Sequence, residues 1–288
     1  MAVSEQELTS LAATHDIISL GMLADDLRRQ RHALNTTFVR VADVAADTGT
    51  PMAIPAGAGE VRIVGAPATR AAAVDRVRQV MAQAQGRVVS AFSLADLEVL
   101  AAGDGVTLRA LLEELHAAGL EMVAEAPFDR LQDPRRSVEE VNISGLALAR
   151  LTVHQSPSPD RLPLLKAVAD LQRAVAVIRA FAPLPRRTNS AAPSTGYDDV
   201  KHVALARVIV DNVPSIQVDW SLYGPKLAQV ALTVGADAID AVSPEDETGE
   251  GRRRVCAAGA WRRVPGPRPP SARRTTRGRR ARRRRAAS

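Results

Sequence analysis

The chain has 288 residues, which is enough for one barrel-sized domain or two small ones, and its hydrophobic fraction of 46% supports a sizeable core. The formal net charge is +6, but residues 252–288 contain 15 arginines and no acidic residue. The remainder has 23 basic and 32 acidic residues, a net charge of −9, and offers no basic surface for a nucleic-acid backbone. Nucleic-acid binding is therefore not expected except through this basic tail.

The cysteine content and the N-terminus limit the chemistry and the compartment. A single cysteine, Cys256, excludes an intramolecular disulfide and any all-cysteine metal site built by one chain. The N-terminus reads as a polar amphipathic helix, and no apolar run reaches the length that spans a bilayer. We therefore expect a cytoplasmic protein with no membrane partner.

The predicted elements begin with two helices and continue as alternating strands and helices. The segment 42–59 has three glycines, two prolines and no helical stripe, so it is predicted to be a loop. Strands are predicted at 36–41, 60–64, 87–92, 119–124, 147–153, 176–182 and 215–222. Helices are predicted at 4–13, 16–32, 69–84, 106–117, 130–140, 159–174 and 198–211.

This alternation predicts the fold class and the domains. Strands that alternate with helices of ten or more residues form parallel sheets with right-handed crossovers. Seven such strands favour an α/β fold with a partial or closed (β/α) TIM-type barrel. We divide the chain into N-terminal helices at 1–34, the barrel at 35–245 and an Arg/Pro-rich tail at 246–288. The tail is predicted to be disordered, and its abrupt composition indicates out-of-frame translation, with a basic arm for RNA or an anionic surface as the alternative.

The stretch 195–240 predicts a helix, a strand that ends near Tyr223 and a second helix that starts at Pro225. Backbone N–H groups at that helix start, together with Lys226, would stabilise an anionic group. Alternatively, Gly224 and Pro225 form only a compact turn and Lys226 is a solvated side chain. Further polar residues in the stretch are predicted to cap helix ends, namely Asp211, Asn212 and Asp240.

Seven segments carry a family resemblance when taken together: LGMLADDLRRQRH (20–32), TTFVR (36–40), EVRIVG (60–65), RLTVH (150–154), AFAPL (180–184), GPKLAQVAL (224–232) and GAD (235–237). In this order they resemble the aminofutalosine synthase family of radical S-adenosylmethionine (SAM) enzymes, which serve the futalosine route to menaquinone. Dehypoxanthine futalosine cyclase and FO synthase are similar but match the GAD segment less well. The resemblance covers about residues 5–245 and implies a radical SAM barrel.

The same resemblance implies two cofactors, a four-iron four-sulfur cluster and SAM. In the family, three cysteines spaced CxxxCxxC hold the cluster in the loop after the first barrel strand, because such clusters require thiolate ligands. Here that loop, 42–59, contains no cysteine. The glycines that contact SAM are also replaced, by Ala66 and by the residues at 124–127. No cofactor is therefore expected in this chain.

The candidate binding residues lie in the second half of the predicted barrel. Arg150, Thr152 and His154 share one face of a predicted strand, and His154 matches a family histidine. The alternative is a histidine that only ties a strand end to its neighbours. Glu121 and Glu125 could line the same cavity or form a solvated pair. The predicted substrate-binding set is His154, Arg150, Thr152, Asp219, Gly224 and Lys226, with no catalytic and no metal-binding residue.

Three functional interpretations follow. The first is a degenerate aminofutalosine synthase-like protein of menaquinone biosynthesis that retains at most small-molecule binding. The second is a cluster-less subunit or binding protein paired with an active radical SAM paralogue, and the third is a non-functional truncated gene product. Whether the chain is an enzyme stays open, because the family is a radical SAM transferase family and this chain lacks the cluster ligands.

Overall fold

The computed structural model describes residues 5–47, 49, 52–155, 161–187 and 195–245. Its strands are β1 (Thr37–Ala45), β2 (Glu60–Val64), β3 (Val88–Ser93), β4 (Met122–Pro127), β5 (Ala147–Leu148), β6 (Leu151–Val153), β7 (Ala180–Pro185), β8 (Ser215–Asp219) and β9 (Ala238–Val242). Its helices are α1 (Glu5–Ala13), α2 (Ile17–His32), α3 (Arg70–Gln83), α4 (Leu94–Gly103), α5 (Leu108–Ala117), α6 (Pro134–Ile143), α7 (Leu162–Val175), α8 (Gly196–Ile209) and α9 (Trp220–Ala231).

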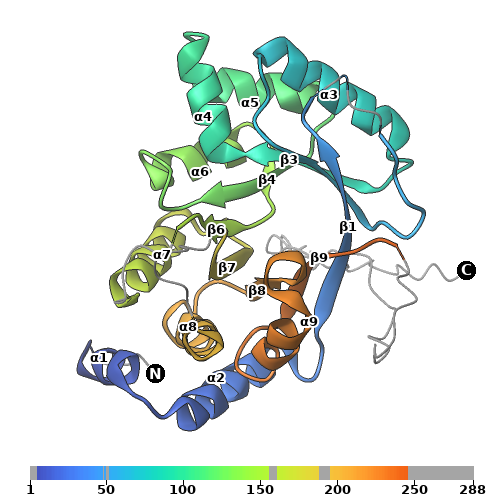
Figure 1. Cartoon of the computed structure of the whole chain (residues 1–288). Coiled ribbons are helices and arrows are strands. Elements are labelled where there is room, and N and C mark those ends of the chain that lie inside the picture. The colour runs from blue at the N-terminus through green and yellow to red at the C-terminus, as the bar shows by residue number, and fades with distance from the viewer. Residues whose placement is uncertain (1–4, 48, 50–51, 156–160, 188–194, 246–288) are drawn as a thin grey trace, which may run out of the picture.

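The sheet closes on itself as a barrel of eight parallel strands. The hydrogen-bonded order runs β3, β2, β1, β9, β8, β7, β6, β4, and a further pairing of β3 with β4 completes the ring. The short strand β5 pairs with β4 just before β6 takes over as the partner of β4. Helices surround the barrel, and the N-terminal helix α2 lies beside α8 and α9 (Figure 1). This architecture is the predicted TIM-type barrel.

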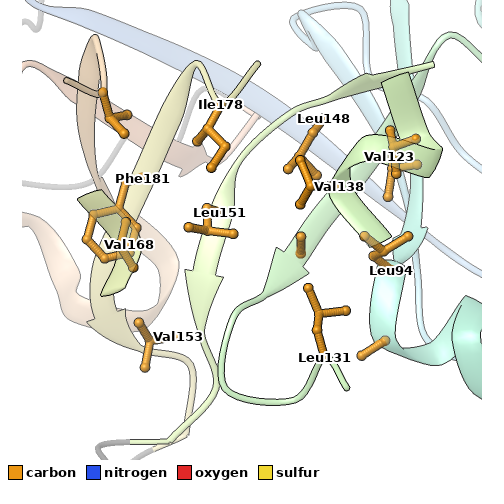
Figure 2. Close-up of a cluster of buried hydrophobic side chains, with 14 of the residues drawn as sticks. Leu94, Val123, Leu131, Val138, Leu148, Leu151, Val153, Val168, Ile178 and Phe181 are labelled. Carbon is orange, nitrogen blue, oxygen red and sulfur yellow. The ribbon is translucent and has the colours of Figure 1, made fainter. Parts of the chain in front are cut away.

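The hydrophobic core lies between the outer face of the barrel and the helices. Side chains on that face alternate with those that point inward, because the side-chain period of a strand is two. Leu151 and Val153 of β6 and Phe181 of β7 pack near Val168 of α7, and all four are buried (Figure 2). These apolar contacts leave the inner face of the same strands for other side chains.

Several predicted boundaries are wrong. The eighth barrel strand, β9, was not predicted, because five residues in AIDAV are too few to reveal a period. Helix α4 was also missed, since it follows β3 without an intervening loop. The loop predicted at 42–59 starts later, because β1 continues to Ala45. The strand predicted at 215–222 ends at Asp219, whose carboxylate caps the next helix by accepting from the Leu222 N–H.

The GAD segment (235–237) stabilises the N-terminal end of the barrel. Buried Arg207 of α8 donates to the carbonyl of Gly235 at 2.7 Å and forms an ion pair with Asp237. Asp237 also accepts from the backbone N–H of Ile216 at 2.8 Å, at the start of β8. A residue at the N-terminal end of a barrel strand usually serves stability, and these contacts agree with such a role.

The capping predictions for Asn212 and Asp240 are also wrong. The Asn212 side chain donates to the Ala169 carbonyl within α7, at 2.7 Å. Asp240 lies on β9 with its carboxylate inside the barrel. For Asp211, the contact found is at its backbone carbonyl, which accepts from Arg31. Among the residues described above, no helix combines the length and apolar character needed to cross a membrane.

Candidate functional site in the barrel interior

The inner face of the barrel is polar and charged. On β2, Val61 and Ile63 belong to the core under the helices, so Glu60 and Arg62 point into the barrel. All four side chains are buried. Because charged groups in a protein interior must be paired, their partners define the arrangement of the interior.

Four charged side chains from three parts of the sheet meet at the middle of the barrel. Arg62 donates to both carboxylate oxygens of Asp240, at 2.8 and 3.3 Å, and to Glu60 at 3.0 Å. Arg150, directly before β6, forms ion pairs with the same two acids, at 3.2 Å to Glu60. Ser90 of β3 donates to Glu60 at 2.6 Å. We call these five residues the central network.

A second layer lies toward the C-terminal ends of the strands. Arg186 follows β7 and forms ion pairs with Asp219 on β8 and, at 3.2 Å, with Glu125 on β4. It also approaches Asp240 of the central network, at 3.9 Å. The interior is therefore one connected charge system that reaches the mouth of the barrel.

The charges shift the acidity of their neighbours. Burial alone would raise the pKa of Asp240, but Arg150 and Arg62 outweigh it and hold that pKa below its usual range. Asp43 on β1 behaves in the opposite way. Partial burial of its carboxyl raises its pKa, Arg62 opposes this, and Asp240, Asp219 and Glu60 add to the rise. The mouth thus contains a carboxyl group, that of Asp43, whose deprotonation is opposed by the neighbouring acids.

The structure brings three of the predicted binding residues into this interior. Arg150 belongs to the central network, and Asp219 belongs to the layer above it. Thr152 lies two residues beyond Arg150, is fully buried, and its hydroxyl finds no hydrogen-bond partner among the described residues. Its unpaired hydroxyl faces the same side as the charged groups.

His154 lies at the rim, one residue beyond the end of β6. Its backbone N–H donates to Asp129 at 2.7 Å, and its carbonyl accepts from the Arg187 N–H at 2.9 Å. Burial and the positive charges of Arg130 and Arg187 lower the pKa of the imidazole. His154 is thus tied to two neighbouring strand ends and sits in a locally basic part of the rim.

Gly224 and Lys226 lie farther from the interior than the other predicted residues. Asp219 already occupies the start of α9, so the helix begins five residues before the predicted start at Pro225. The non-helical backbone at Gly224, with φ of 72°, breaks the helix into two parts, and the second part starts at Pro225 as predicted. Lys226 is exposed one residue beyond Pro225. These two residues are not joined to the charged interior by any contact found in the described part of the chain.

Sequence reasoning missed most of the charged interior. Glu60, Arg62, Arg186 and Asp240 were not among the predicted site residues, although Asp240 was noted as a helix cap. A signal was present, since EVRIV places Glu60 and Arg62 at alternate positions and AIDAV places Asp240 in an otherwise apolar strand. Such positions must face a polar interior if the other face is buried under helices.

The residues present do not fit a four-iron four-sulfur cluster. The connection between β1 and β2, which follows the first barrel strand, has no cysteine, and the whole sequence has one, Cys256. Three thiolates are required to hold such a cluster with one iron open. Glu60 and Asp240 of the central network are already engaged by arginines and do not replace thiolates.

The fold defines the class of protein, a TIM-type α/β barrel, and solved structures share this fold. Methylornithine synthase is similar with a TM-score of 0.63 and 11% identity, over 87% of this chain and 86% of the other. The hydrogenase maturase HydG is similar with a TM-score of 0.59 and 9% identity, over 83% of this chain and 64% of the other. At this identity the likeness concerns the fold alone. No protein-family profile matches the chain.

Curated relatives support the resemblance to the aminofutalosine synthase-like family. Cyclic dehypoxanthine futalosine synthase of Streptomyces coelicolor is 25% identical over 198 residues, 61% of this chain and 48% of that protein. Aminodeoxyfutalosine synthase of Thermus thermophilus is 26% identical over 202 residues, 60% and 54% of the two chains. A 5-amino-6-(D-ribitylamino)uracil–L-tyrosine 4-hydroxyphenyl transferase of Methanosphaerula palustris is 27% identical over 173 residues, 51% and 47%. The chain spans about half the length of the curated relatives it matches.

Proposed function

We propose that this chain is an aminofutalosine synthase-like protein of menaquinone biosynthesis that lacks the family cofactor and retains small-molecule binding at the mouth of its barrel. One observation carries the proposal: a barrel without cluster cysteines keeps a fully connected charged interior that opens toward the C-terminal ends of its strands. Ligand sites of (β/α) barrels lie at this end.

The physical chemistry of that interior supports binding more than stability. Burying an ion pair takes two charges out of water, so apolar residues of similar volume would stabilise a barrel core at least as well. The side chains of Arg150 and Asp240 are each about 97% buried, so water does not stabilise their charges. A chain that keeps such pairs in a fixed arrangement retains a polar surface that can recognise a ligand.

The experiment is a calorimetric titration of the full chain with futalosine-pathway intermediates. Lys226, exposed near the rim, would approach an anionic group of the ligand. The Lys226→Ala variant should therefore bind less tightly by about 1 to 2 kcal/mol, the scale of one charge-assisted hydrogen bond. Lys201→Ala, which removes the same charge from α8, is the matched control and should bind as the wild type does. If no intermediate binds the wild type, the proposed function is wrong.

A further inference from the structure

The inner face of the barrel contains more carboxylates than guanidinium groups. Three arginines face the interior and its mouth, at positions 62, 150 and 186. Five acids face them, namely Asp43, Glu60, Glu125, Asp219 and Asp240. The formal charge of this described set is therefore −2 when all eight groups are ionised.

The excess negative charge is concentrated at Asp43. This residue is in register with Arg62 on the neighbouring strand, so it points to the same side, into the mouth. Its side chain is exposed, whereas its acidic neighbours in the central network are buried. No hydrogen bond or ion pair to the Asp43 carboxylate is found among the described residues, while Asp219 and Asp240 each bind arginines.

A second and independent observation comes from two uncharged side chains on the same inner face. The hydroxyl of Thr152 and the Oε1 oxygen of Gln217 have no hydrogen-bond partner in the described part of the chain, although both residues are at least 95% buried. Gln217 lies two residues before Asp219, and Thr152 two residues after Arg150, so each points inward. Buried acceptors left unpaired are costly and call for a donor.

The strand residues beside these atoms are small. The residue in register with Thr152 on β7 is Ala182, and the residue in register with Gln217 on β9 is Ala238. Both contribute only a methyl group to the interior. The unpaired oxygens are therefore flanked by the smallest side chains of the wall.

We infer that the barrel interior binds a small organic cation, which is attracted by the negative charge of the mouth at Asp43 and donates hydrogen bonds to the unpaired acceptors of the opposite wall. An ammonium group carries three N–H donors and no acceptor, which matches a wall with unpaired acceptors and a net negative charge. A carboxylate would add to that negative charge and would compete with Asp219 and Asp240 for their arginines. The inference rests on the proposed function only in taking the mouth to be a small-molecule site.

The test compares three four-carbon probes that differ in charge. Putrescine, 1,4-butanediol and succinate are each titrated into the full chain, and binding is followed by ligand-observed NMR. In a second experiment, butanediol and succinate are each added to the putrescine complex to test whether they displace putrescine. We expect putrescine to bind at least tenfold more tightly than butanediol, and succinate not to displace it. Displacement matters because the 15 arginines of the tail offer succinate another place to bind. Absence of putrescine binding, or its displacement by succinate, would overturn the inference.

Single-residue variants show where putrescine binds. Asp43→Asn and Gln217→Met should each weaken putrescine binding by at least fivefold. Glu121→Gln removes the same charge as Asp43→Asn from an exposed position before the start of β4, at the opposite end of the barrel, and should leave binding unchanged. Equal weakening by Glu121→Gln would mean a general attraction to the acidic body and would refute the site. If pathway intermediates bind but putrescine does not, only this inference fails; if putrescine alone binds, only the proposed pathway fails.

Discussion

Arg62 on β2 donates two hydrogen bonds to Asp240 on β9, at 2.8 and 3.3 Å, across the strand β1 that separates them in the sheet. The two residues are 178 positions apart in the chain. The first and last parts of the barrel are thus joined inside as well as through the backbone of the sheet. The contact also orients Asp240 so that Oδ2, which accepts the longer of these two bonds, forms the ion pair with Arg150 as well.

Removing the Asp240 carboxylate should strongly destabilise the fold. Asp240→Asn leaves Arg62 and Arg150 buried with one counter-charge, Glu60, and breaking a buried pair in this way costs about 3 to 5 kcal/mol. Urea denaturation followed by circular dichroism measures the change. Asp43→Asn is the control, because no ion pair to that carboxylate is found in the described part of the chain, and its effect should stay within about 0.5 kcal/mol. Similar losses for both variants would show that the central network is not a stabilising pairing.

His202 should make the fold sensitive to mild acid. Burial, together with the charge of Arg161, lowers its pKa to about 3, although a hydrogen bond to the Pro183 carbonyl opposes the shift. Between that value and its pKa of 6.5 in the unfolded chain, only the unfolded state takes up the proton. Stability should therefore fall as the pH decreases below 6.5, by about 1.4 kcal/mol per pH unit from this residue.

The measurement for His202 is a series of urea titrations between pH 7 and pH 4.5. His202→Gln can still donate to Pro183 but does not titrate, so the difference in stability between wild type and variant should change with pH. Parallel curves for the two proteins would show that His202 is not the group responsible.

Anaerobic reconstitution with iron and sulfide should not load a cluster. The sequence offers one cysteine, Cys256, against the three that the family uses. We expect no stoichiometric cluster and no reductive cleavage of SAM. About four irons per chain with broad absorbance near 400 nm would contradict this expectation. An active homologue with CxxxCxxC, treated in parallel, shows that the procedure works.

Two glycines should differ in their tolerance of a methyl group. Both have positive φ, 113° at Gly235 and 72° at Gly224. A Cβ at Gly235 would lie 2.8 Å from the Cβ of Arg207 and 3.1 Å from that of Ala24, whereas nothing lies within 4 Å at Gly224. Gly224→Ala should therefore lose about 1 to 3 kcal/mol from backbone strain alone, and Gly235→Ala should lose more. Thermal melting of the two variants compares them, and equal losses would show that the contact with Arg207 relaxes.

The barrel could be predicted from the sequence because its evidence is local. Most strands are followed by a helix of ten or more residues, and this order specifies a parallel sheet with crossovers. The central network could not be predicted in the same way. Its partners, such as Arg150 and Glu60, are 90 positions apart, and no periodicity reports which inward side chains meet. Alternate charged positions in β2 and β9 indicate only that the interior is polar.

The predicted rim site illustrates the same limit. Proline placement predicts a helix start at Pro225, and the second part of α9 does start there, after the non-helical Gly224; the helical turn before it, capped by Asp219, was missed. Which of two adjacent signals begins a helix depends on tertiary partners, here the ion pair of Asp219 with Arg186. Whether His154 and Lys226 contact a ligand stays a prediction.

The pairing of β1 with β9 has a consequence for biosynthesis. β1 is complete once residue 45 is made, but its second neighbour in the sheet begins only at Ala238. During translation β1 and β8 each present an unpaired edge, and unpaired edges recruit other chains. The nascent protein must protect the edge of β1 for almost two hundred residues of synthesis, so a chain whose synthesis stops before β9 has a sheet that is prone to aggregate.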